Sequence, residues 1–262
     1  MPRQRGFRQR LADWSSVQKA RGLALVLVVS IAGLGYLTQR YGLDVRLAIG
    51  VILADFSVTV VIALASIALA LLVIDSLNER SAEEQVKAKL TRELCSTDNG
   101  IALRAVRELR ARGWLEDGSL RGANLVGVNL RRAYLIGGNL QEAALFRADL
   151  HEADLVGANL QGAELRRANL REAKLNYTDL RGAYLARANL AAADLRGAKL
   201  QGAKLQGVDL RGAKLRGADL RGARLAFADL TGADLTGALL QETNLQEAIL
   251  EGATMPDGSK HE

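Results

Sequence analysis

Leucine occupies every fifth position from Leu120 to Leu250 without exception, which gives 27 consecutive repeats. Alanine stands two positions before most of these leucines, as at Ala143 and Ala148, so the unit is A-[N/D/K]-L-x-x. On an α-helix, residues five apart are about 140° out of phase, and on a flat strand they lie on opposite faces. The pattern therefore predicts short extended segments joined by corners, with each leucine pointing to one central axis beside a small alanine.

Glycine is frequent two positions after the leucine, as at Gly122 and Gly127, where it suits a corner that needs a positive φ angle. Residues 20 apart form coherent columns, of which one is rich in Asn and Asp and its neighbour alternates Asp with Lys. The first column is Asn129, Asp149, Asn169, Asn189, Asp209 and Asp229, and the second is Tyr134, Asp154, Lys174, Asp194, Lys214 and Asp234. Such ladders are favoured between strands about 4.8 Å apart. A spacing of 15 mixes the columns, so the sequence favours a four-sided coil.

The uninterrupted tract, for example ADLHEADLVGANLQGAELRRANL, resembles the pentapeptide-repeat family over about half of the chain. The resemblance implies an all-β solenoid, a right-handed quadrilateral β-helix, which we place at residues 116–255. Seven or so coils at strand spacing predict a rod roughly 30 to 35 Å long.

The N-terminal part follows a different pattern. Residues 1–22 form a basic arm with a single acidic residue, Asp13, and an apolar run from Leu23 to Leu37 follows. A second run extends from Leu47 to Ile74, and its inner part, Phe56–Ile74, has no charged residue and is long enough to cross a bilayer of about 30 Å. We therefore expect a two-helix transmembrane hairpin at residues 23–74, with a buried helical pair in a soluble protein as the alternative.

The basic arm predicts that the N terminus lies in the cytoplasm, and two spans return the chain to the same side. We therefore expect a multi-pass membrane protein with both termini and the rod in the cytoplasm. Residues 75–115 are predicted to form a helical stalk and a cap, because an open solenoid end exposes core and unpaired strand edges. The segment 96–100 suits the N-cap of a second helix, which Gly113 ends. Residues 256–262 form a polar tail.

Several outward positions are candidates for an interaction surface. Four arginines gather in the 20-residue stacking, where they would suit phosphate or an acidic partner; these are Arg147, Arg166, Arg167 and Arg187. The alternative is that they are solvated or paired with glutamates such as Glu152 and Glu172.

Apolar residues at outward positions are the second kind of candidate. Val126 stacks with Phe146, and Ile136 with Val156, so these pairs could receive the stalk helix or a partner. Leu239 and Ile249 replace the usual polar residue near the C-terminal end, where they indicate a contact surface unless an irregular last coil hides them.

Charge and chemistry exclude several classes of function. Some pentapeptide-repeat proteins resemble DNA in shape and negative charge and bind gyrase, but residues 121–255 contain 18 Lys or Arg against 15 Asp or Glu and no loop insertion. A topoisomerase inhibitor is therefore disfavoured, and so is nucleic-acid binding, since there is no recognition helix or aromatic stacking set. His151 and His261 make no metal set, and Cys95 has no evident activating partner. We expect neither a cofactor nor an enzyme.

Two hypotheses on function follow. The first is a non-enzymatic, membrane-anchored scaffold whose rod binds an unknown protein partner. The second is a homo-oligomer of the hairpin, formed through the small-residue pairs Thr59/Ala63 and Ser66/Ala70, which acts as a channel or transport accessory under control of the rod.

Overall fold

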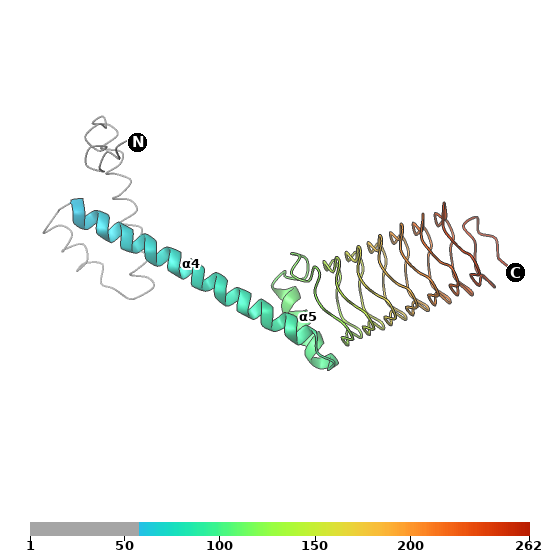
Figure 1. Ribbon diagram of the computed structural model, residues 1–262, viewed down its shortest axis with the longest axis horizontal. Helices are drawn as coiled ribbons and strands as arrows, with labels where there is room; N and C mark the ends of the chain where they lie inside the picture. Colours follow the sequence, from blue (N-terminus) through green and yellow to red (C-terminus); the bar gives the residue numbers. More distant parts are fainter. Residues whose placement is uncertain (1–57) are drawn as a thin grey trace, which may run out of the picture. The chain divides into compact units, whose positions relative to one another are not determined.

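The computed structural model describes residues 58–262, with side chains described from residue 66 onward. These residues form helix α4 (Val58–Leu94), helix α5 (Asn99–Ala111) and then a stack of similar coils that continues to the C terminus (Figure 1). The chain divides into two compact units, Met1–Glu84 and Gln85–Glu262. The second unit contains α5 and all the coils.

The predicted membrane hairpin falls largely on residues that the structure does not describe. The run from Leu23 to Leu37 and the start of the second run lie outside the described residues, whereas the end of the second run belongs to α4. Helix α4 continues through the charged stalk without a break. None of the helices in the described part of the chain is long and apolar enough to cross a membrane.

Helix α5 has defined ends on both sides. At its start, Asp98 Oδ1 accepts hydrogen bonds from the N–H groups of Gly100 (2.7 Å) and Ile101 (3.2 Å), which is the N-cap expected in segment 96–100. At its end, Gly113 has a φ of 72°, and its N–H donates to the Arg110 carbonyl. The N–H of Trp114 donates five residues back, to the Leu109 carbonyl, which completes a Schellman motif.

The first coil is covered by α5 and the last turns of α4. Ala102, Ala105, Val106 and Leu109 of α5 are buried in the same hydrophobic cluster as the leucines of the coils. Asn99 Nδ2 donates to the backbone oxygen of Asn129 at 3.2 Å, which ties the start of α5 to the first coil. This helical pair thus shields the core that an open solenoid end would expose.

The coils pair in parallel with a register of 20 residues, from Asn124 with Ala144 to Asp234 with Thr254. Each side of a coil has one residue that pairs with the residue 20 positions later. Backbone hydrogen bonds beside these pairs join the coils; for example, the Leu130 N–H donates to the Asp149 carbonyl at 2.7 Å. Four pentapeptides therefore close one coil. This register confirms the four-sided β-helix that the columns in the sequence predict.

Each corner is a tight turn closed by a hydrogen bond between the residue after the corner and the leucine before it. At one such corner the Ala133 N–H donates to the Leu130 carbonyl at 3.0 Å, and the third residue, Arg132, has a φ of 58°. A positive φ at that place is the conformation of a type II turn, which glycine adopts most easily. Glycine occupies many corners, as expected, but Arg, Glu, Tyr, Phe and Ala adopt the same conformation at others.

The core is a column of leucine and alanine side chains along the axis of the coils. Almost all of the repeat leucines and alanines are fully buried, but Leu240, Leu245 and Leu250 of the last coil are only partly so. The polar tail folds back at this end, where Thr254 forms an antiparallel bridge with Lys260. The tail therefore covers one side of the last coil and leaves the ladder open on the other sides.

Candidate functional site: the arginine corner

Where Asn or Asp precedes a repeat leucine, its outward side chain has a local role that the sequence pattern alone does not reveal. Its side-chain oxygen accepts a hydrogen bond from the N–H two residues later, as Asp209 does from Arg211 at 3.1 Å and Asn159 from Gln161 at 3.0 Å. That N–H belongs to the first corner residue and points away from the ladder. The Asx preference of the repeat is therefore explained by satisfied turn donors.

Where arginine follows the sequence D-L, it also binds the aspartate next to it. The Arg211 guanidinium donates two hydrogen bonds to Asp209, at 2.9 and 2.6 Å, and Arg181 does the same to Asp179. These guanidinium groups hold the pKa of Asp209 and Asp179 below the usual range, against the opposing effect of burial. All four D-L-R arginines, Arg181, Arg196, Arg211 and Arg221, thus form an ion pair with an aspartate of the rod.

A different environment surrounds Arg147, Arg167 and Arg187, which we call the arginine corner. They occupy the third position of the same turn in three successive coils, at φ angles of 57°, 57° and 59°. The equivalent residues of the neighbouring coils are Gly127 and Gly207. Because the coils are about 4.8 Å apart, three like charges are stacked at a position where glycine would remove both the repulsion and the backbone strain.

The arginine corner lacks internal carboxylate partners. Among the described residues, no ion pair or side-chain hydrogen bond involves Arg147, Arg167 or Arg187, and the Arg147 guanidinium lies over the ring of the adjacent Phe146, 5.2 Å from its centroid. The glutamates considered as partners are engaged elsewhere. Glu152 pairs with Arg132 at 2.8 Å and with His151, while Glu172 pairs with Arg171 at 3.0 Å.

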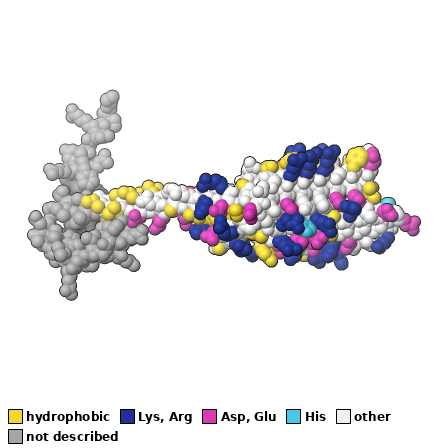
Figure 2. Space-filling view, turned by 90° about the horizontal axis from the view of Figure 1, so that it is seen from below, with side chains coloured by type: hydrophobic (Ala, Val, Ile, Leu, Met, Phe, Trp, Pro, Cys, Tyr) yellow, Lys and Arg dark blue, Asp and Glu magenta, His cyan; other side chains and the backbone are white. Residues whose placement is uncertain are grey.

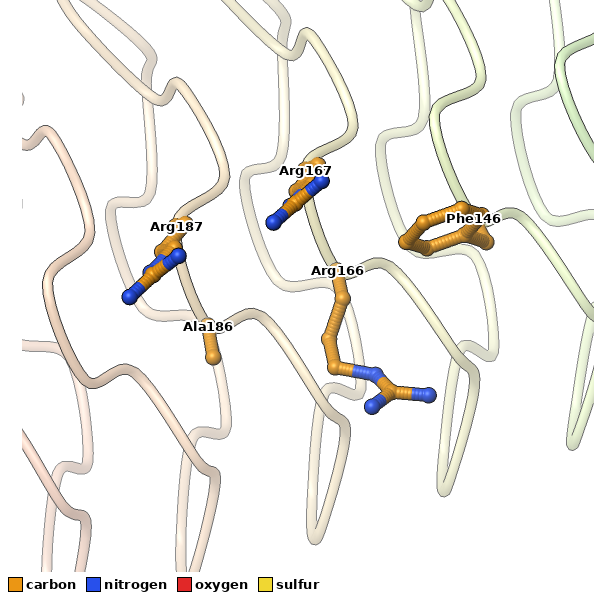
Figure 3. Close-up of a pocket in the computed structure, with 5 residues that line it drawn as sticks. All are labelled: Phe146, Arg166, Arg167, Ala186 and Arg187. Carbon is orange, nitrogen blue, oxygen red and sulfur yellow. The ribbon is translucent and has the colours of Figure 1, made fainter.

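Arg166 differs from its neighbours, because its Nε donates to Glu164 at 2.5 Å. It nevertheless lines the same surface hollow of about 490 Å³ as Phe146, Arg167, Ala186 and Arg187. In Figure 3, Arg167 and Arg187 project in the same direction from neighbouring coils, Arg166 turns away from them, and the Phe146 ring lies one coil further along. The hollow therefore combines two guanidinium groups without carboxylate partners with an aromatic surface.

A second hollow, of about 340 Å³, adjoins the first and shares Arg167 and Arg187 with it. Arg131, His151 and Arg171 also line it, on the next corner of the same coils. Arg131 pairs with Asp149 at 3.3 Å. The space-filling view shows basic side chains gathered in dense groups on the rod, with acidic side chains among them elsewhere (Figure 2).

The apolar candidates lie at three separate places on the rod. Val126 is 52% exposed and stacks on Phe146 at the corner that continues into the arginine corner. Leu239 and Ile249 are 41% and 51% exposed, so the last coil does not hide them. They pair with Asp219 and Asp229 in different ladders, which lie on opposite sides of the four-sided coil. The two residues therefore do not form one contact surface.

The candidates for chemistry lie in ordinary surroundings. The Cys95 thiol donates to the Asn124 carbonyl at 3.0 Å, and burial raises its pKa. His151 Nδ1 lies 2.9 Å from the Arg171 carbonyl and its Nε2 lies 2.9 Å from Glu152. No group of three or more His, Cys, Asp or Glu side chains in the described part of the chain is placed to hold a metal ion.

Comparison with known proteins agrees with this architecture. A family model for pentapeptide repeats matches eight copies over residues 119–151, 148–185, 178–217 and 218–255. None of the curated proteins compared with the chain matches it significantly.

Solved structures with similarity to the chain carry the same repeat. HetL, a pentapeptide repeat protein involved in heterocyst differentiation regulation in Nostoc sp., is 32% identical over 54% of this chain and 86% of its own, with a TM-score of 0.22. A pentapeptide repeat protein of the Arabidopsis thaliana thylakoid lumen is 31% identical over 40% of this chain and 69% of its own, with a TM-score of 0.25. The matches of the family model together span more than half of the sequence, and the chain belongs to the pentapeptide-repeat proteins.

Proposed function

We propose that this protein is a non-enzymatic, membrane-anchored scaffold whose rod binds a protein partner through the arginine corner. The observation that carries the proposal is the placement of Arg147, Arg167 and Arg187 at the same left-handed corner position in successive coils, without an internal carboxylate partner. Like-charge stacking and a positive φ both act against folding at these positions. A partner that supplies negative charge offsets the repulsion among the three arginines when it binds.

The membrane anchor in this proposal rests on the sequence and on the surface of α4. Phe56–Ile74 has no charged side chain. The described part of that stretch exposes large apolar side chains on several sides of the helix, among them Ile67, Leu69 and Val73 at 50 to 57%. A helix that is apolar all round needs a non-aqueous environment. The basic arm favours a cytoplasmic position for the rod.

The test separates the anchor from the binding surface. Crosslinking and quantitative affinity capture in native membranes would compare the full chain, a chain without residues 1–75, and the triple variant Arg147→Gly, Arg167→Gly, Arg187→Gly. We expect a captured partner that the triple variant loses and that Arg132→Gly retains. Arg132 is the matched control, because it has the same backbone conformation but is already bound to Glu152.

Two outcomes would contradict the proposal. If the triple variant captured the same proteins as the full chain, the arginine corner would not be the binding surface. Extraction of membranes at alkaline pH tests the anchor, since the full chain should stay in the pellet and the chain without residues 1–75 should not. Release of the full chain under these conditions would exclude an integral anchor.

A further inference from the structure

The spacing of the arginine corner limits the kind of partner that fits it. Successive coils place Arg147, Arg167 and Arg187 at axial positions of about 0, 4.8 and 9.6 Å. Glutamates at positions i, i+3 and i+7 of an α-helix rise by about 4.5 and 10.5 Å and lie on one face. Alternate residues of an extended strand rise by about 6.7 and 13.4 Å, so the third carboxylate would be out of register by about 4 Å.

We propose that the arginine corner binds an acidic α-helix of a partner protein, with carboxylates at i, i+3 and i+7 and an apolar side chain beside them. This inference rests on the proposed function and specifies its partner. The apolar side chain would fill the hollow between Phe146 and Arg166, whose walls are largely the aromatic ring and the aliphatic parts of side chains. Arg166 stays neutralised by Glu164, so three unpaired guanidinium groups face three carboxylates.

The surroundings disfavour the two other polyanions that arginines commonly bind. A bilayer surface is flat and would touch the whole corner column, but this column continues as Gly207, Phe227 and Glu247 on one side and Gly127 on the other. Duplex DNA would extend over the neighbouring ladders, where Asp149 and Glu164 are paired with Arg131 and Arg166, so it would find little unpaired positive charge there. The cationic segment covers only three coils, or about 10 Å, which matches two turns of a helix.

The direction of the side chains supports a shared ligand. Arg187 lies along the rod toward the next coil, since its Cγ is 3.8 Å from where a Cβ would be on Gly207. Arg167 runs in the same direction in Figure 3. The side chains of Arg167 and Arg187 are therefore staggered along the rod axis and lean in the same direction, which suits one elongated partner.

The experiment measures binding of fluorescent peptides to the purified full chain by polarisation. The probe is a 21-residue helical peptide with glutamates at i, i+3 and i+7 and one leucine beside the first. A second peptide of the same composition places the glutamates on three different faces, and a third replaces them with glutamine. We expect the first peptide to bind at least tenfold more tightly than either of the others.

Protein variants complete the test. The triple variant Arg147→Gly, Arg167→Gly, Arg187→Gly should bind the first peptide at least tenfold more weakly than the natural chain does. Arg132→Gly should change the affinity for this peptide less than twofold. Phe146→Ala should weaken the binding of the first peptide and leave unaffected the binding of a fourth peptide, in which alanine replaces the leucine. Unchanged circular dichroism of each variant verifies that the rod remains folded.

Equal binding of the two glutamate peptides would overturn the inference, because charge alone would then explain it. Arginine-dependent binding of a 20-base-pair DNA duplex or of anionic lipid vesicles, with no preference among peptides, would overturn it in favour of those ligands. If partner capture depended on the arginine corner while no helical peptide bound, the scaffold function would stand and the acidic helix would fail. If the peptide bound but partner capture did not depend on the arginine corner, the site would bind acidic helices and the proposed scaffold function would fail.

Discussion

At the scale of single residues, the corner positions combine backbone strain with surface chemistry. A left-handed conformation costs a non-glycine residue about 1–2 kcal/mol, while glycine loses about 0.5–1 kcal/mol more chain entropy than alanine on folding. The two effects partly cancel, so an arginine at a corner is slightly unfavourable for folding. Arginine nevertheless occupies this position in three successive coils, at Arg147, Arg167 and Arg187.

The first prediction concerns this strain. Arg167→Gly should raise the free energy of unfolding by about 0.5–1 kcal/mol, because it relieves the left-handed φ and the repulsion from Arg147 and Arg187. Urea unfolding followed by circular dichroism measures the change. Arg132→Gly should gain less, since it also loses the ion pair with Glu152. A destabilised Arg167→Gly variant would indicate a structural role for Arg167.

The second prediction concerns acid. The Arg211 guanidinium lowers the pKa of Asp209 from its usual 3.8 in the folded state, so the ion pair stabilises the fold above that pH and loses its effect as pH falls through the folded value. Asp209→Asn keeps an acceptor for the Arg211 N–H but removes the charge.

We therefore expect Asp209→Asn to be less stable than the natural chain by up to about 1 kcal/mol at pH 7, with the difference vanishing below the lowered pKa. Urea unfolding at a series of pH values between 2 and 7 measures it. A difference that stays constant over this range would show that the carboxylate charge does not contribute.

At the scale of elements, the helical cap and the coil share one core. Leu109 is fully buried in this core, whereas Ile101 of the same helix is 39% exposed. Leu109→Ala should therefore lower the free energy of unfolding by about 2–5 kcal/mol, and Ile101→Ala should lower it by less than half of that. Thermal unfolding compares the two variants. Equal effects would mean that α5 does not cover the first coil.

The coil was predictable from the sequence because its physical causes repeat. Leucine at one phase defines the core, glycine marks the corner, and the 20-residue columns define the register that the bridges show. The ends of α5 were equally local, since Asp98 and Gly113 cap it through backbone groups a few residues away. Each of these features depends on spacing, which a sequence contains in full.

The side-chain contacts on the surface of the rod could not be predicted from the sequence. The hydrogen bond that the Arg211 N–H donates to Asp209, and the pairing of Arg166 with Glu164, depend on side-chain rotamers that spacing does not determine. The sequence suggested a joint surface for Leu239 and Ile249, although the 20-residue register places them on opposite sides. Here the information was present, but the positions were compared along the chain instead of around the coil.

At the scale of the whole molecule, the two ends of the coil stack differ. The helical cap covers the first coil, while in the last coil the N–H groups of Leu240, Leu245 and Leu250 have no hydrogen-bond acceptor within the described residues. Leu180 and Leu185, in contrast, donate to the next coil at 2.7 and 2.8 Å. The stability of a solenoid is roughly a sum of the contacts between neighbouring coils, and the last coil has a neighbour on one side only. The last coil is therefore expected to be the least stable.

This asymmetry predicts a gradient of amide hydrogen exchange along the rod. The amides of the last coil should exchange fastest, those of the central coils slowest, and the first coil should be protected by α5. Hydrogen exchange followed by mass spectrometry of peptides resolves the coils. Uniform protection up to Leu250 would indicate that another molecule covers the C-terminal end.

The equivalence of the four corners has a consequence for how the sequence of such a rod evolves. Every pentapeptide has the same backbone shape and the same inward leucine, so the insertion of one unit would leave the core intact. All side chains after the insertion would nevertheless rotate by a quarter turn about the rod axis. A single five-residue duplication between Arg147 and Arg167 would thus move Arg167 and Arg187 to the adjacent edge and separate them from Arg147. Because the tract from Leu120 to Leu250 is unbroken, every outward residue keeps a fixed angle about the rod axis, and residues 20 apart stay on the same face.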